Sequence, residues 1–134
     1  MQSLSVIFFG DFSDERIAWN AAASHLGWSV HRVSDLNSLG HVSNGREVAA
    51  VFVDQRAQGT SDAIRLRSIR ALLPEARIIL CCPLRSMRDI DPETLGAFHV
   101  VARPLKLGEL RTSMGFVSES WCRQKHAESR VAAA

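Results

Sequence analysis

The chain lacks the features of membrane and secreted proteins. No apolar run approaches the roughly 18 residues that a spanning helix needs. The amino terminus has no basic segment followed by an apolar one and a small-residue cleavage site, so no secretory signal is expected. Only three cysteines occur, and two of them, Cys81 and Cys82, are adjacent inside an apolar run, which does not make a disulfide framework. These absences predict a protein of the reducing cytoplasm without membrane association.

The motifs of several enzyme and metal-site classes are also missing. There is no Cys-x-x-Cys pair, and the five histidines show no ligand spacing, so a zinc site is not expected. The chain has neither a phosphate-loop lysine nor a dinucleotide fingerprint, and no serine stands in a nucleophile elbow. The net charge of +2 is too small to imply a nucleic-acid partner.

What is present is the composition of one globular domain. The 134 residues are 46% hydrophobic and 22% charged, and a chain of this length can bury a proper core. Strand-like runs at 5–9, 28–33, 48–53, 78–82 and 98–102 alternate with helical spacing near 14–25, 34–42, 62–73, 91–96 and 107–121. We expect a domain over residues 1–121. The polar, alanine-rich residues 122–134 are a tail or linker that extends the last helix, frays or joins another segment.

The residue patterns also predict which side chains point inward and where helices begin. In the first helix, Ile17, Ala18, Ala21, Ala22 and Leu26 share one face, and in the third Ile69, Leu72 and Leu73 are expected to be buried. Ser34 is the expected cap of the second helix, and Asp91-Pro92 opens the fourth.

Alternating strands and helices indicate a mostly parallel sheet with helices on both faces. The run at 28–33 alternates apolar and polar residues, as an edge strand does, whereas those at 5–9, 48–53 and 78–82 have the character of central strands. This pattern fits a five-stranded flavodoxin-like sheet of order 2-1-3-4-5. In that order the ligand crevice lies where the first and third strands end.

Two carboxylates follow those two strands. Asp11 comes after the run at 5–9, and Asp54 ends the run at 48–53. An ion at the end of a buried strand needs a partner, a metal or a chemical role. The sequence therefore predicts that Asp11 and Asp54 share a site.

With these residues in place, the chain resembles the receiver domains of two-component response regulators over roughly residues 4–120. Asp54 falls on the phosphoacceptor position, and Gly10-Asp11 stands where the family has an acidic pair. Cys82 falls on the Ser/Thr position that ends the fourth strand, and Arg103-Pro104 replaces the Lys-Pro that follows the fifth. The spacings between these positions are also close to those of the family.

The resemblance implies a phosphorelay function. A histidine kinase would donate phosphate to Asp54, Arg103 would contact the phosphoryl group, and Cys82 would occupy the hydroxyl position. Asp11, Asp54 and the backbone carbonyl of Arg56 would hold Mg²⁺, more weakly than three carboxylates do. The only catalysis this implies is Mg²⁺-dependent self-phosphorylation from a phosphodonor, so the domain is not expected to be an enzyme.

The departures from the family pattern support a second hypothesis. Gly10 removes one carboxylate, Cys82 replaces a hydroxyl, and arginine replaces lysine at position 103. Arg103, or less simply Arg56, would then pair permanently with Asp54. The domain would be a phosphorylation-independent pseudo-receiver that binds a protein partner or forms a homodimer. The expected interface is the surface of the fourth helix, fifth strand and last helix, roughly residues 89–118.

Overall fold

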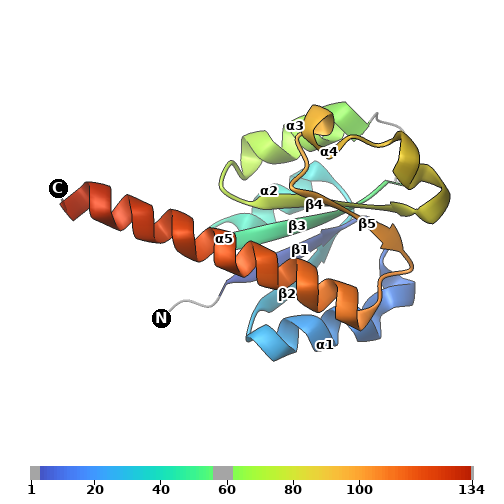
Figure 1. The fold of residues 1–134 in the computed structure, drawn as a ribbon, viewed down its shortest axis with the longest axis horizontal. Coiled ribbons are helices and arrows are strands. Elements are labelled where there is room, and N and C mark those ends of the chain that lie inside the picture. Colours follow the sequence, from blue (N-terminus) through green and yellow to red (C-terminus); the bar gives the residue numbers. More distant parts are fainter. Residues whose placement is uncertain (1–3, 56–61, 134) are drawn as a thin grey trace.

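A computed structural model of the chain describes residues 4–55 and 62–133. Five parallel strands form one sheet in the order β2-β1-β3-β4-β5 (Figure 1), which confirms the predicted flavodoxin-like topology. The strands are β1 (Ser5–Phe9), β2 (Ser29–Val33), β3 (Val48–Asp54), β4 (Arg77–Pro83) and β5 (His99–Arg103).

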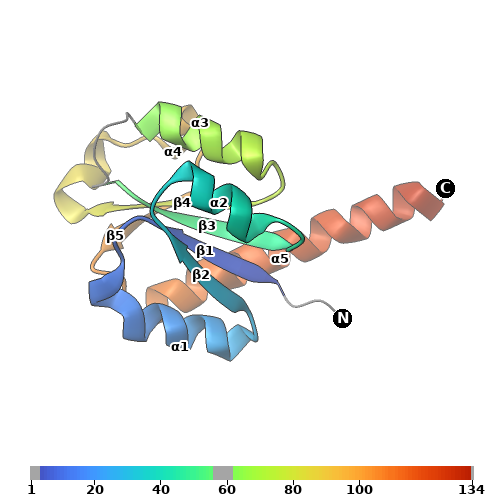
Figure 2. The ribbon, with the colours of Figure 1, turned by 180° about the vertical axis from the view of Figure 1, so that it is seen from behind.

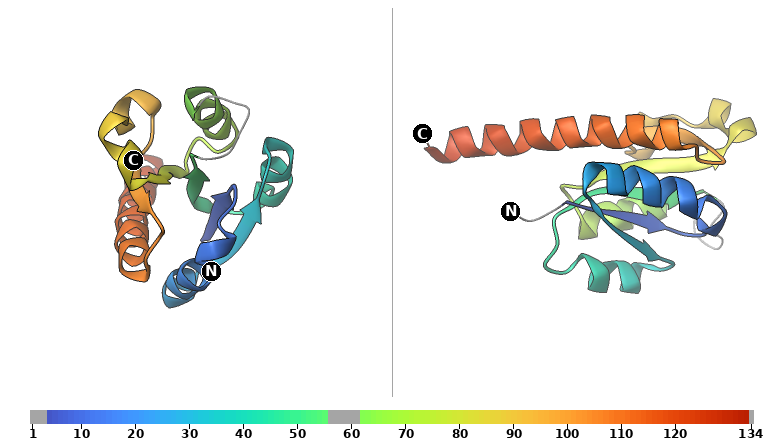
Figure 3. Two further views of the ribbon diagram at one scale, coloured as in Figure 1. Left: turned by 90° about the vertical axis from the view of Figure 1, so that its right-hand side faces the viewer. Right: turned by 90° about the horizontal axis from the view of Figure 1, so that it is seen from below.

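Helices cover both faces of the sheet. The helices α1 and α5 lie on one face and α2, α3 and α4 on the other, as Figure 2 and the end view in Figure 3 show. The helical elements are η1 (Ser13–Glu15), α1 (Arg16–Leu26), α2 (Leu36–Ser43), α3 (Asp62–Leu72), η2 (Leu84–Asp89), α4 (Pro92–Leu95) and α5 (Leu107–Ala133), of which η1 and η2 are 3-10 helices. None of the helices in the described ranges combines the length and apolar character that crossing a membrane requires.

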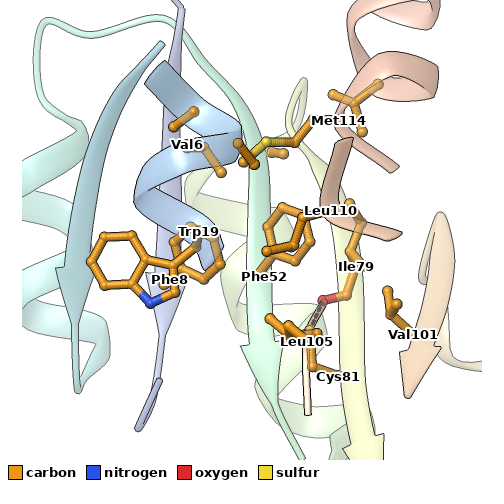
Figure 4. Packing of buried hydrophobic residues seen from close by; sticks show 14 of the residues in the cluster. Val6, Phe8, Trp19, Phe52, Ile79, Cys81, Val101, Leu105, Leu110 and Met114 are labelled. Carbon is orange, nitrogen blue, oxygen red and sulfur yellow. Dashed lines mark hydrogen bonds between the residues drawn. The ribbon is translucent and has the colours of Figure 1, made fainter. Parts of the chain in front are cut away.

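A hydrophobic core lies on each face of the sheet, and every residue of β3 is buried between the two. On the α1–α5 face, the Phe8 ring stacks on Phe52 at 4.9 Å and on Trp19 at 5.0 Å between centroids. Leu110 and Met114 of α5 pack into this core (Figure 4). Ala50 and Phe52 of β3 face this core, so Asp54 follows Phe52 on the same side.

The structure corrects the predicted inner faces of two helices. Ile17 is 88% exposed, and Trp19 and Ala23 are buried in its place. The indole of Trp19 donates to the carbonyl of Phe12 at 2.9 Å, and this bond sets the rotation of α1 on the sheet. In α3, Leu66 is buried whereas Leu72 is 46% exposed.

Two other boundaries differ from the expectation. The cap of α2 is Asp35 rather than Ser34, because the Asp35 carboxylate accepts from Ser38 N–H at 2.7 Å. The last helix passes residue 121 and continues to Ala133, the first of the three outcomes left open for the tail. Its distal part projects beyond the amino-terminal edge of the sheet (Figures 1 and 3).

Candidate functional site

Asp54 is the last residue of β3 and one of the few buried charged residues, with 2% of its surface exposed. Arg103 ends β5, and its Nη1 lies 2.7 Å from Asp54 Oδ1. The contact is ionic rather than a well-aligned hydrogen bond, since Nη1 has no acceptor in line with its N–H groups. The guanidinium that the sequence placed near the phosphoacceptor position is thus directly against the carboxylate.

A second buried carboxylate holds the same guanidinium. Arg103 Nη2 donates to Glu15 Oε1 in a short ion pair, and also to the backbone carbonyl of Asp11 at 2.8 Å. The other oxygen of Glu15 accepts from Leu105 N–H at 2.8 Å. The Arg103 guanidinium also lies 4.5 Å from the centroid of the Phe12 ring, within range of a cation–π contact. Two carboxylates, one carbonyl and one ring therefore surround this cation.

This surrounding keeps Arg103 charged. Burial works against the cation, but the hydrogen bond that it donates to Glu15 and the negative charge of Asp54 outweigh it, so the pKa of the Arg103 guanidinium is raised. The side chains of Arg103 and its two acidic partners are all less than a tenth exposed. We call Glu15, Asp54 and Arg103 the buried ion network.

Gly10 packs directly against Asp54. Its backbone has φ +120°, a conformation that favours glycine, and a Cβ placed on it would lie 2.5 Å from the Asp54 Cβ. The absence of an acidic side chain at position 10 therefore agrees with how closely this residue packs against Asp54. A side chain at position 10 requires Asp54 to move.

Asp11 reaches this end of the sheet, but its carboxylate is engaged in its own turn. The side chain is exposed and accepts from Ser13 N–H at 3.2 Å and from Ser13 Oγ at 2.7 Å. Its backbone carbonyl, and not its carboxylate, contacts Arg103. The structure thus gathers Asp11 and Asp54 at one sheet edge, with an arginine between the Asp11 backbone and the Asp54 carboxylate.

The two adjacent cysteines of β4 lie on opposite faces of the sheet. Cys81 is paired in register with Asp54 and belongs to the same core as Phe52, so strand alternation turns Cys82 to the other face. Both are fully buried. Burial raises the pKa of the Cys81 thiol well above its usual value, although the nearby charge of Arg103 acts in the opposite direction. Arg56, the third predicted metal ligand, lies outside the described residues.

The described side chains at this edge of the sheet do not form a carboxylate cluster for Mg²⁺. This ion demands near-octahedral oxygen ligands with open positions for water. Within the described ranges no three His, Cys, Asp or Glu side chains gather as a metal group, and both buried carboxylates contact Arg103. A pocket of about 220 Å³ opens beside the network and is lined by Asp14, Glu15, Pro83, Arg103 and Pro104. The described side chains hold Asp54 in an ion pair with Arg103.

Glu15 is the site residue that the sequence interpretation missed. It lies four residues before Trp19 and seven before Ala22, both of which are buried on the inner face of α1. A carboxylate on the buried stripe of an amphipathic helix was the available signal. Because the prediction rotated the helix so that Ile17 faced inward, it did not identify Glu15.

No protein-family model matches the sequence, and no curated protein matches it either. Solved structures do match. An adenylate cyclase from Rhodopirellula baltica has a TM-score of 0.76 at 12% identity, with 100% of each chain covered. The chemotaxis response regulator CheY4 of Vibrio cholerae has a TM-score of 0.66 at 12% identity, over 87% of this chain and 99% of that one.

NtrX from Brucella abortus is a longer protein that contains a similar fold. It has a TM-score of 0.78 at 18% identity, over 96% of this chain but only 29% of its own. Identities this low show a shared fold and leave the chemistry open. The chain has the receiver fold of two-component response regulators, with a buried ion pair between Asp54 and Arg103 where β3 and β5 end.

Proposed function

We propose that this domain is a pseudo-receiver, a phosphorylation-independent module for protein–protein interaction or dimerisation. The observation that carries the proposal is the placement of the Arg103 guanidinium, 2.7 Å from Asp54 and bound at the same time to Glu15. The position that a phosphoryl group and its metal would share is held by a side chain of the protein itself.

Phosphoryl transfer to Asp54 would have to dismantle this network. Transfer to a carboxylate depends on in-line positioning and on cations that neutralise the phosphoryl oxygens. Arg103 is such a cation, but it is already neutralised by two carboxylates. Breaking a buried ion pair on one side costs about 3–5 kcal/mol. Phosphorelay through a histidine kinase is therefore the alternative, and it requires Arg103 to move off Asp54.

The proposal assigns the domain a protein partner and no catalytic step. Mg²⁺ is not needed to hold Asp54, because the guanidinium supplies the counter-charge. The proposed contact surface is residues 89–118, comprising α4, β5 and the first part of α5. This surface contains β5, which is at the edge of the sheet.

Exposure to a phosphodonor tests the proposal. Wild-type protein and Asp54→Asn are incubated with Mg²⁺ and a small phosphodonor, and separately with beryllofluoride, and are compared by intact mass and by ¹⁹F NMR. We expect no phosphoryl adduct and no bound beryllofluoride in either protein. An adduct on the wild type that is absent from Asp54→Asn would refute the pseudo-receiver proposal and establish Asp54 as a phosphoacceptor.

A further inference from the structure

A pocket of about 260 Å³ lies at the amino-terminal edge of the sheet. Its walls come from the turn before β3, the end of α3 with the turn that follows it, and one residue of α5. The buried ion network, by contrast, lies where β3 and β5 end. The pocket is therefore separate from the site described above, and a ligand bound there would serve a function beyond the proposed one.

The lining of the pocket is largely apolar. Val48 and Ala76 are less than a tenth exposed, Leu73 is partly buried, and Leu72 is 46% exposed. Such a lining favours an apolar group over water. The volume is below the roughly 300–1,000 Å³ of sites for drug-sized molecules, so the group that fits is small.

Trp121 forms the α5 side of the pocket, and several contacts fix this part of the helix. The Nζ of Lys125 lies 4.8 Å from the centroid of the Trp121 ring and 3.0 Å from Oε2 of Glu75. Arg77 Nη2 donates to Gln124 Oε1 at 2.7 Å in the same part of α5. Figure 3 shows α5 passing this edge of the sheet. The wall is therefore preformed, which lowers the cost of binding a ligand.

The indole N–H of Trp121 donates to no acceptor among the described residues. Trp121 is only 5% exposed, yet its nitrogen is not one of the fully enclosed unpaired atoms, so the donor remains accessible. Buried indole N–H groups usually have a partner, as Trp19 does in the carbonyl of Phe12. Since Trp121 borders the pocket, its N–H is available to an acceptor carried by a ligand.

Two opposite charges, Arg46 and Glu47, border the same pocket. Both residues are exposed, and neither forms an ion pair with another residue in the described ranges. Arg46 Nη1 donates to a backbone carbonyl of α2 at 2.8 Å, which leaves its other N–H groups available. The third charged residue of the lining, Glu75, is already paired with Lys125. Arg46 and Glu47 therefore offer one cation and one anion to a ligand.

We infer that this pocket binds a free amino acid with a large apolar side chain. Arg46 and the Trp121 N–H receive its carboxylate, Glu47 receives its ammonium group, and the apolar lining receives its side chain. A purely apolar molecule would use none of these polar groups. A ligand with a single charge would pair with only one of Arg46 and Glu47, whereas a zwitterion pairs with both.

Titration of ¹⁵N-labelled protein with L-leucine, and separately with L-phenylalanine, tests the site by NMR. The indole N–H signal of Trp121, assigned with Trp121→Phe, should shift saturably, whereas that of Trp19 should stay in place because its donor is already bonded. Arg46→Gln and Glu47→Gln should each weaken binding about three- to fivefold, as the loss of an exposed charge pair does. Arg67→Gln is the matched control, because Arg67 is an exposed arginine of α3 outside the pocket lining, and it should leave the affinity unchanged. Thermal unfolding checks that each variant is folded. A Trp121 signal that does not shift, or equal effects of Arg46→Gln and Arg67→Gln, would overturn the inference.

Two truncated analogues of leucine test which residue receives which charge. Isocaproate lacks the ammonium group and isoamylamine lacks the carboxylate, and each should bind the wild type more weakly than leucine does. Glu47→Gln should weaken the binding of isoamylamine and leave that of isocaproate unchanged. Arg46→Gln should have the opposite pattern. Isocaproate or isoamylamine binding as tightly as leucine, or analogue affinities that neither substitution changes, would overturn the assignment of a zwitterionic ligand.

Discussion

Replacing Arg103 with alanine should destabilise the fold strongly. The substitution leaves Asp54 and Glu15 buried without their shared counter-charge, and both side chains are only 4% exposed. Losing one side of a buried ion pair costs about 3–5 kcal/mol. That is a large part of the roughly 5–15 kcal/mol that holds a domain together. At roughly 3–5 °C per kcal/mol for a chain of this size, the melting temperature should fall by about 10–20 °C.

Chemical denaturation of two further variants separates this charge effect from simple truncation. Arg123→Ala removes an arginine whose 3.6 Å pair with Glu119 is exposed, and it should cost no more than about 0.5 kcal/mol. Adding Asp54→Asn and Glu15→Gln to Arg103→Ala neutralises the two abandoned carboxylates, so part of the lost stability should return. An Arg103→Ala protein that is no less stable than Arg123→Ala would refute the buried ion network as a stabilising feature.

The pH dependence of the same variant has a definite sign. Because the pKa of the Arg103 guanidinium is raised in the fold, its stabilising contribution is complete below the ordinary arginine value and is lost only as pH rises through the raised one. Between about pH 5 and 9 the wild type should therefore show no change in stability from arginine titration. The stability difference between the wild type and Arg103→Ala should therefore contain no contribution from arginine titration in this range.

Three other predictions follow from single residues. Gly10→Ala should cost at least about 2 kcal/mol, because its Cβ collides with a neighbouring side chain at φ +120°, whereas Gly115→Ala, with open space around it, should stabilise α5 by up to about 1 kcal/mol. A thiol reagent should label exposed Cys122 in the native protein but label Cys81 only after unfolding, since Cys81 is fully buried and burial raises its pKa. Burial lowers the pKa of His31, so its stabilising contribution is lost as pH falls, and His31→Gln should flatten unfolding stability between about pH 7 and 5.

The fold was predictable because its signals are repeated along the chain. Each strand is a separate apolar run, and the difference between the alternating residues at 28–33 and the uniformly apolar residues at 48–53 distinguishes an edge strand from a central one. The rotation of α1 was not predictable in this way. Alanines surround the helix on several sides, so apolar spacing alone allowed Ile17 to point inward, and the bond from the Trp19 indole to Phe12 decided otherwise.

The site was predictable in its location and only partly in its contacts. Parallel strands end at a common edge, so the positions of Asp54 and Arg103 in the sequence were enough to place them near each other. The role of Glu15 depends on the rotation of α1, and the fit of Gly10 against Asp54 depends on a backbone angle. Residue spacing predicts neither the rotation of α1 nor the backbone angle of Gly10. The second carboxylate of the network and the steric reason for glycine therefore came from the structure.

The presence of an aspartate at position 54 is by itself weak support for phosphorylation in this protein. In a fold with a buried arginine at position 103, the carboxylate of Asp54 is needed as a counter-ion whatever the domain does. Asparagine there would leave Glu15 as the one carboxylate paired with the guanidinium among the described residues, and a side chain at position 10 would collide with Asp54. Gly10, Asp54 and Arg103 therefore constrain one another through contact and charge. Replacing Gly10 with an acidic residue, or Arg103 with lysine, one at a time would disrupt these contacts without forming a metal site.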